Sequence, residues 1–97
     1  MVIFVKDISP DAMTFEDGER VYHAIIEGLK SGPSVSISFD GISSVPTSFV
    51  NGSFVQLLDD MTLDAIKSKV HVRNANKQIG NLLLKRLTFV AENRAFA

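Results

Sequence analysis

The sequence predicts an α/β fold with a mainly parallel or mixed sheet of three to five strands and about three helices, mostly on one face. Two kinds of stretch alternate along the chain. Some show the two-residue alternation of half-buried strands, and in the others apolar residues recur at helical spacing. Strands that alternate with helices favour parallel pairing with right-handed crossovers. The second and third predicted strands are polar on one face, which favours helices mostly on the other face and leaves the polar face open, lightly covered or used for contact.

The composition indicates a single domain, residues 1–97. The hydrophobic content of 45% and the charged content of 22% are ordinary for a soluble globular protein, and the net charge of −1 gives no general attraction to nucleic acid or anionic lipid. Cysteine is absent, which excludes disulfides and thiolate chemistry and fits a reducing compartment. The start of the chain does not resemble a signal peptide, and no apolar run is long enough to span a membrane. We therefore expect a cytoplasmic protein that binds neither nucleic acid nor membrane.

The N-terminal third predicts a strand followed by a helix. Residues 1–6 are apolar and rich in β-branched side chains, which favours a strand, and residues 12–13 weakly indicate a second short extended piece. Thr14 and Asp17 fit the capping pattern of a helix start, with Asp17 itself as a rival N-cap. The helix should end before the Gly-Pro pair at residues 32–33.

The central stretch, residues 34–61, predicts a strand, a loop and a helix. Apolar residues alternate with serines over residues 34–39, and the Asp-Gly pair Asp40 and Gly41 ends that strand. Hydroxyl side chains then gather where a helix must begin, and apolar residues recur at helical spacing over residues 49–61. A helix start carries unpaired N–H groups and suits a side-chain oxygen or an anion, so we place the candidate site here.

The last third predicts a further strand and a long helix. Residues 62–66 either continue the central helix or form a separate turn, and residues 69–73 alternate as a half-buried strand. Asn74 is a plausible N-cap for the last helix, with Asn76 as a rival, and the helix should reach about Glu92. Gly80 within it costs up to about 1 kcal/mol relative to alanine, which suggests close packing there.

These patterns also predict which side chains form the core. The expected core residues are Ile3, Val5, Ile25, Leu29, Val35, Ile37, Phe39, Phe49, Leu57, Val72, Ile79, Leu83 and Leu87.

The stretch F-D-G-I-S-S-V-P-T-S-F-V-N-G-S-F-V-Q-L-L, residues 39–58, resembles the STAS-like domain family of unknown function, itself similar to the STAS fold of anti-sigma factor antagonists. In that fold a strand leads into a loop and a helix start with an Asp-Ser pair, and the serine can be phosphorylated by a histidine-kinase-like ATPase. By position, Thr47 corresponds to the aspartate and Ser48 to the serine, although Thr47 lacks the carboxylate. The resemblance implies a regulatory interaction module rather than an enzyme.

Each candidate residue also has an ordinary structural interpretation. Ser44, Thr47 and Ser48 form a phosphoacceptor or anion site, or one of them caps the helix while the others are solvated turn residues. Asp40 pairs with a hydroxyl or cation, or hydrogen-bonds its own backbone in the turn. The two histidines are far apart in the chain and no Cys is present, so no metal site or cofactor is expected. The chain also lacks the G-x-S-x-G pattern of a serine hydrolase.

Three functions follow from the sequence. The first is a protein-interaction module whose partner is a histidine-kinase-like ATPase or another signalling protein, with Ser48 or Thr47 as phosphoacceptor. The second is a structural or self-associating module, such as a homodimer that pairs through the polar sheet face. The third is a small ligand-binding or hydrolytic domain that uses the loop between Asp40 and Ser48. The residues expected to contact a partner are Asp40, Gly41, Ser44, Asn51, Ser53 and Gln56.

Overall fold

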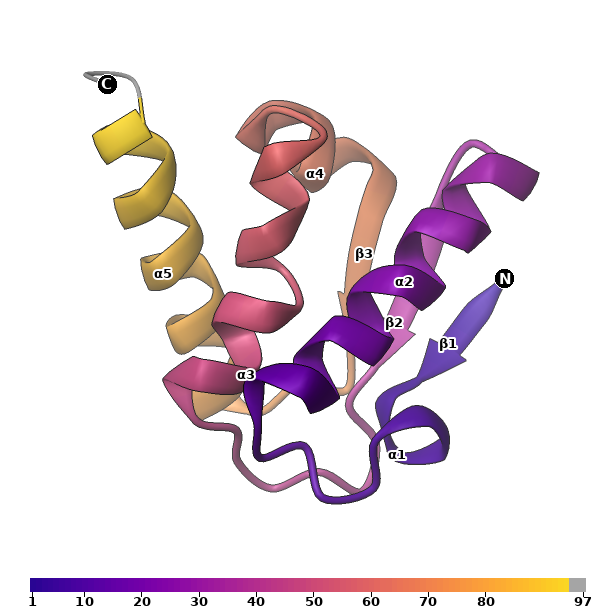
Figure 1. Ribbon diagram of the computed structural model, residues 1–97. Helices are drawn as coiled ribbons and strands as arrows, with labels where there is room; N and C mark the ends of the chain where they lie inside the picture. Colours follow the sequence, from indigo (N-terminus) through magenta and orange to yellow (C-terminus); the bar gives the residue numbers. More distant parts are fainter. Residues whose placement is uncertain (95–97) are drawn as a thin grey trace.

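The computed structural model describes residues 1–94 as an α/β fold with one three-stranded sheet (Figure 1). Its elements in chain order are β1 (Val2–Phe4), α1 (Val5–Ile8), α2 (Phe15–Ser31), β2 (Val35–Ser38), α3 (Thr47–Gly52), the 3₁₀ helix η1 (Val55–Asp59), α4 (Leu63–Lys69), β3 (Val70–Arg73) and α5 (Lys77–Arg94).

All three strands run parallel in the order β1-β2-β3. Ile3 pairs with Ile37, and Ile37 pairs with Val72, so these three side chains share the face that carries the helices. Their neighbours along the strands point to the opposite face, where Phe4 is 44% exposed and His71 and Arg73 are exposed. The expected fold class, with helices mostly on one face, is therefore confirmed.

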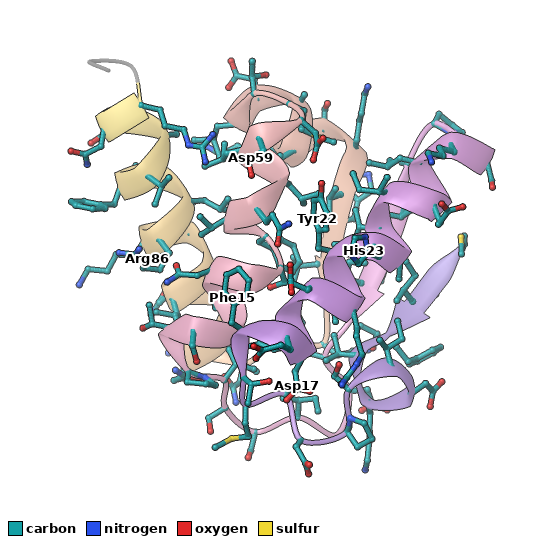
Figure 2. The ribbon with its side chains drawn as sticks, viewed as in Figure 1. Phe15, Asp17, Tyr22, His23, Asp59 and Arg86 are labelled. Atoms are coloured by element: carbon teal, nitrogen blue, oxygen red, sulfur yellow. The ribbon has the colours of Figure 1, made fainter. Side chains whose placement is uncertain are left out.

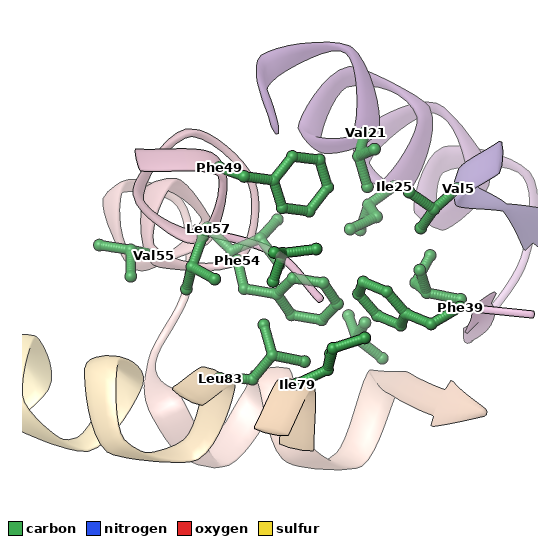
Figure 3. Packing of buried hydrophobic residues seen from close by; sticks show 14 of the residues in the cluster. Val5, Val21, Ile25, Phe39, Phe49, Phe54, Val55, Leu57, Ile79 and Leu83 are labelled. Carbon is green, nitrogen blue, oxygen red and sulfur yellow. The ribbon is translucent and has the colours of Figure 1, made fainter. Parts of the chain in front are cut away.

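The core lies between this sheet and the helices (Figure 3). Phe39, Phe49 and Phe54 are buried, and the rings of Phe39 and Phe54 stack with their centroids 6.2 Å apart. All the expected core residues are buried except two. Leu29 is half-buried, and Val72 is 40% exposed because it lies on an edge strand.

The N-terminal segment departs from the expected strand of residues 1–6. The strand ends at Phe4, and a four-residue helix begins at the buried Val5. An unbroken apolar run does not reveal where a strand ends, because both elements bury the same residue types. The second extended piece at residues 12–13 does not form, since Ala12 has a φ of 47° and lies in a turn closed by its N–H on the Ser9 carbonyl.

The start of α2 follows the expected capping box. The Thr14 side chain accepts a hydrogen bond from the Asp17 N–H, and the Asp17 carboxylate accepts from the Thr14 N–H, each at about 3 Å. Asp17 therefore lies in the first turn, and the rival assignment of Asp17 as N-cap is wrong.

The central helix expected over residues 49–61 is broken into α3 and η1. The Ser53 hydroxyl donates to the carbonyl of Phe49 at 2.8 Å, and such back-bonding to a preceding carbonyl competes with the regular ladder. Thr62 starts a separate helix, because its side chain accepts from the Ala65 N–H and caps α4. Residues 62–66 thus belong to a new element rather than to a continuation.

At the start of α5 the N-cap is Asn76, the alternative to Asn74. The Asn76 side chain accepts from the Ile79 N–H at 3.0 Å, so Asn76 is the cap. Asn74 has a φ of 58° and donates to the Ser38 hydroxyl instead, so its assignment as N-cap is wrong.

Gly80 is not closely packed, contrary to expectation. A Cβ built at this position meets no atom within 4 Å. We expect Gly80→Ala to raise the free energy of unfolding by about 0.5–1 kcal/mol, because alanine restricts the unfolded chain and suits a helix interior. Urea melts at equal m-values measure this difference, and a loss of stability would show that α5 has a neighbour at this position.

Candidate functional site

The 40–48 loop (residues 40–48) begins at the carboxyl edge of the sheet (Figure 1). The strands are parallel, so the segments that follow β1, β2 and β3 all leave the sheet at this edge. Asp40 and Gly41 are exposed, and the Asp40 N–H donates to the Ser38 hydroxyl at 3.2 Å. Gly41 has a φ of 80° and lies against the Lys6 side chain, which brings the loop beside α1. Asp40 is thus a turn residue at the surface.

Three amide side chains hold the end of β2 and the 40–48 loop against the junction of β3 and α5. Asn74 donates to the Ser38 hydroxyl at 3.0 Å, and Asn76 donates to the Ser43 carbonyl at 2.6 Å. The Gln78 side chain accepts a hydrogen bond from the Val45 N–H and donates one to the Val45 carbonyl, both at 3.4 Å. The sequence analysis assigned no such role to Asn76 or Gln78. Their spacing of two residues directly after a strand was the available signal.

Ser48 lies exposed in the first turn of α3, as the sequence predicted. Its hydroxyl donates to the Met13 carbonyl at 3.1 Å. Thr47 and Ser44 are also exposed. The N-cap is Pro46, which has no side-chain acceptor, so the interpretation that one of the three hydroxyls caps the helix is wrong. α3 has six residues, so few peptide dipoles align behind its start.

Two exposed apolar residues that the sequence analysis did not single out belong to the segment whose backbone contacts α3. Met13 is 59% exposed and Phe15 is 42% exposed. The Met13 carbonyl accepts from Ser48, and the Phe15 carbonyl approaches Gly52 of α3 so closely that no Cβ fits between them. We call the group formed by Met13, Phe15, Ser48 and Asn51 the α2–α3 surface.

A cation borders the α2–α3 surface on the side of α5. Arg86 donates to the Asn51 side chain at 3.2 Å, and its guanidinium carbon lies 5.5 Å from the centroid of the Phe89 ring. Phe89 is itself 56% exposed. Figure 2 shows Phe15 in front of the α3 segment, with Arg86 on α5 beside it. The surface therefore combines apolar area with a positioned arginine.

Two of the expected partner contacts are placed differently. Ser53 is fully buried, with its hydroxyl bonded to the Phe49 carbonyl, so it offers no surface to a partner and the expectation for it is wrong. Gln56 is half-buried, and within residues 1–94 its Oε1 atom is buried without a hydrogen-bond donor. Asn51 is half-buried and engaged by Arg86. The structure thus brings Ser48 and Asn51 together on one surface and excludes Ser53 from it.

Two ionisable groups have shifted pKa values with clear causes. Hydrogen bonds from the Met13 and Thr14 N–H groups, helped by the Thr14 hydroxyl and Arg20, lower the pKa of the half-buried Asp17 carboxyl. The hydrogen bond from Tyr22 to the Asp60 carboxylate raises the pKa of Tyr22 to about 12. Asp17 therefore places a negative charge on the same backbone segment that Ser48 contacts.

The arrangement around Ser48 lacks the partners of a nucleophile. A catalytic serine needs an adjacent base, whereas the Ser48 hydroxyl donates to a backbone carbonyl. Within residues 1–94 no group of three or more metal-ligating side chains converges, and no pocket is found. None of the helices in this range is long and apolar enough to cross a membrane. The ligand-binding alternative thus gains no support from the geometry.

A family model describes the STAS-like domain of unknown function (DUF4325), and it matches residues 17–80. The chain belongs to this family. The STAS-like match runs from the first turn of α2 into the first turn of α5, and it includes the 40–48 loop and Ser48. β1, α1 and Met13 lie before the matched part of the STAS-like domain. Neither the curated proteins nor the solved structures compared with the chain include a match.

Proposed function

We propose that this STAS-like domain is a regulatory module that binds another protein and does not itself catalyse a reaction. The observation that supports this best is the α2–α3 surface, where the exposed Ser48 hydroxyl donates to the Met13 carbonyl and the side chains of Met13 and Phe15 are exposed. Exposed apolar area next to groups that form hydrogen bonds is typical of interaction sites. Arg86 at the border adds a cation of the kind that often anchors a partner.

The proposed partner is a histidine-kinase-like ATPase in the cytoplasm, with Ser48 as its phosphoacceptor. Transfer of the γ-phosphoryl group of ATP to the Ser48 oxygen releases the hydroxyl proton and ADP. The phosphate brings roughly −2 charge and removes the donor that Ser48 offers to the Met13 carbonyl. Asp17 accepts hydrogen bonds from the Met13 and Thr14 N–H groups, so the new charge is added at a segment that already carries a carboxylate. Repulsion between them would re-order that segment and change the surface offered to the partner.

Ser48→Asp tests the role of this surface. We expect it to weaken binding to the proposed histidine-kinase-like ATPase partner by at least about tenfold. Stability should change by no more than about 1 kcal/mol, because only an exposed hydrogen bond is lost and negative charge is tolerated in a first helical turn. Calorimetric titration and urea melts measure the two quantities.

Thr62→Asp is the matched control. Thr62 is exposed and caps α4, and aspartate caps equally well, so the same charge is added at a helix start on another part of the chain. This variant should bind as the wild type does. Wild-type binding by Ser48→Asp, or unfolding of that variant without any partner, contradicts the proposal. A phosphate found by mass spectrometry on Ser48 after incubation with the ATPase and ATP supports the phosphoacceptor role, and its absence refutes that role.

A further inference from the structure

Both outer strands of the sheet present free backbone groups. The Ser36 N–H donates to the Met1 carbonyl. Because the backbone groups of successive residues point alternately to the two sides of a strand, the N–H and C=O groups of Val2 point away from β2. The Phe39 N–H bonds the Arg73 carbonyl, so the corresponding groups of Val72 turn away from β2 on the other side. No strand within residues 1–94 covers either edge.

Both edge strands are short, which is one of the usual protections of a sheet edge, and β3 also carries His71 and Arg73. Neither strand contains a proline, and both expose apolar side chains. β1 consists of Val2, Ile3 and Phe4 only, with Val2 49% and Phe4 44% exposed, and Val72 on β3 is 40% exposed. Each edge therefore joins unpaired backbone groups to exposed apolar side chains.

The two edges belong to oppositely charged parts of the chain. Residues 1–40, which form β1, α1, α2 and β2, carry seven acidic and three basic side chains. Residues 65–77, which include β3, carry four lysines or arginines and no acidic side chain. By the net charges of these two segments, pairing of β3 with β1 is favoured over pairing of two identical edges.

We propose that the chain associates head to tail with further copies of itself, the β3 edge of one copy pairing in parallel with the β1 edge of the next. The free backbone groups define the register. The N–H and C=O of Val72 reach the residues on either side of Ile3 in the next copy, so Val72 and that Ile3 become partners. Both side chains point to the helix face of their own sheet, and Arg73 then meets Phe4 of the next copy on the open face. In this register the hydrogen-bond pattern and the direction of the side chains are consistent with one continuous parallel sheet.

This assembly uses neither Ser48 nor the 40–48 loop, so it stands or fails separately from the proposed function. A contact between different edges leaves one free edge on each added copy, so the chain should form oligomers larger than a dimer. Sedimentation velocity should show an average mass that rises with concentration at about 50 mM salt and falls at about 500 mM, because salt screens the charge term. A chain that stays monomeric to about 1 mM at the lower salt overturns the proposal.

Proline substitutions at the two edges test the polarity of the contact. Val2→Pro and Val72→Pro each remove an outward N–H that no strand within residues 1–94 uses, and proline is tolerated at such edge positions. Each variant alone should be monomeric, since one of its edges is blocked. An equimolar mixture should form a dimer and stop there, because the free β3 edge of the first variant pairs with the free β1 edge of the second. A dimer of either variant alone, or a monomeric mixture, overturns the proposal.

A charge reversal covers the case in which a proline variant does not fold. Arg73→Glu should weaken self-association by at least about tenfold at low salt. Lys85→Glu makes the same change on the exposed side of α5 and should leave association unchanged. Equal effects of the two reversals refute an edge contact. If the chain does not self-associate but binds a poly-glutamate peptide, the β3 edge is assigned to a foreign acidic partner. That result likewise refutes the contact between copies.

Discussion

Phe39→Ala should lower the free energy of unfolding by about 3–5 kcal/mol, a large part of the 5–15 kcal/mol typical of a domain. Phe39 is fully buried directly after β2, and its ring stacks on that of Phe54 with an angle of 28° between the planes. Truncation removes the burial of the ring, leaves a cavity between sheet and helices, and ends an aromatic pair worth about 0.5–1.5 kcal/mol beyond its buried area. Urea melts with unchanged m-value give the difference.

Phe89→Ala is the control for this prediction. Phe89 is 56% exposed on α5 and contacts Arg86, so its truncation should cost less than about 1 kcal/mol. If Phe39→Ala does not fold, Phe39→Leu should still lose about 1–2 kcal/mol, because much of the apolar volume remains. A loss below about 1 kcal/mol for Phe39→Ala means that the buried face of β2 has been assigned to the wrong side.

The sequence predicted those parts of the fold that depend on local pattern. Alternation over residues 34–39 placed β2 and its buried face, and the pair Thr14 and Asp17 placed the start of α2. In both places the deciding contacts lie within a few residues of one another, or follow from one face being apolar. Ser48 at the start of a helix also followed from local pattern.

Features that depend on two distant segments meeting could not be predicted in this way. The α2–α3 surface forms because the Met13 carbonyl receives the hydroxyl of a residue 35 positions later. The break between α3 and η1 depends on Ser53 turning inward, which a helical spacing of apolar residues does not reveal. Asn74 and Asn76 were equally plausible caps, and the contact of Asn74 with the distant Ser38 distinguishes them.

The glycines illustrate this limit most directly. Gly80 lies in the first turn of α5 and was expected to be closely packed, yet it faces open space. Gly18 and Gly52 were not singled out, yet they form the closest approach between two helices. A Cβ at Gly18 would lie 2.2 Å from the Phe49 carbonyl oxygen, and a Cβ at Gly52 would lie 2.2 Å from the Phe15 carbonyl oxygen. Which glycine is closely packed depends on which helix faces meet in the fold, and the amino-acid sequence alone does not show which faces meet.

Gly52→Ala should therefore lower the free energy of unfolding by at least about 2 kcal/mol. The atoms around the new methyl group belong to the backbone of α2, with the Phe15 carbonyl carbon at 3.1 Å and the Glu19 nitrogen at 3.2 Å. Backbone atoms cannot rotate away as a side chain does, so the two helices must move apart. The gain in helix propensity, at most about 1 kcal/mol, does not offset that separation.

Gly80→Ala makes the same chemical change in open space, so the two substitutions should shift the midpoint of urea unfolding in opposite directions. Gly18→Ala opens the same crossing from the other helix, and the double variant with Gly52→Ala should lose less than the sum of the single losses, since one separation accommodates both methyl groups. The crossing also holds Met13 and Phe15 beside Ser48, so any Gly52→Ala protein that folds should bind the partner more weakly than Gly80→Ala does. Equal stability of Gly52→Ala and Gly80→Ala would show that α2 and α3 do not cross at these glycines.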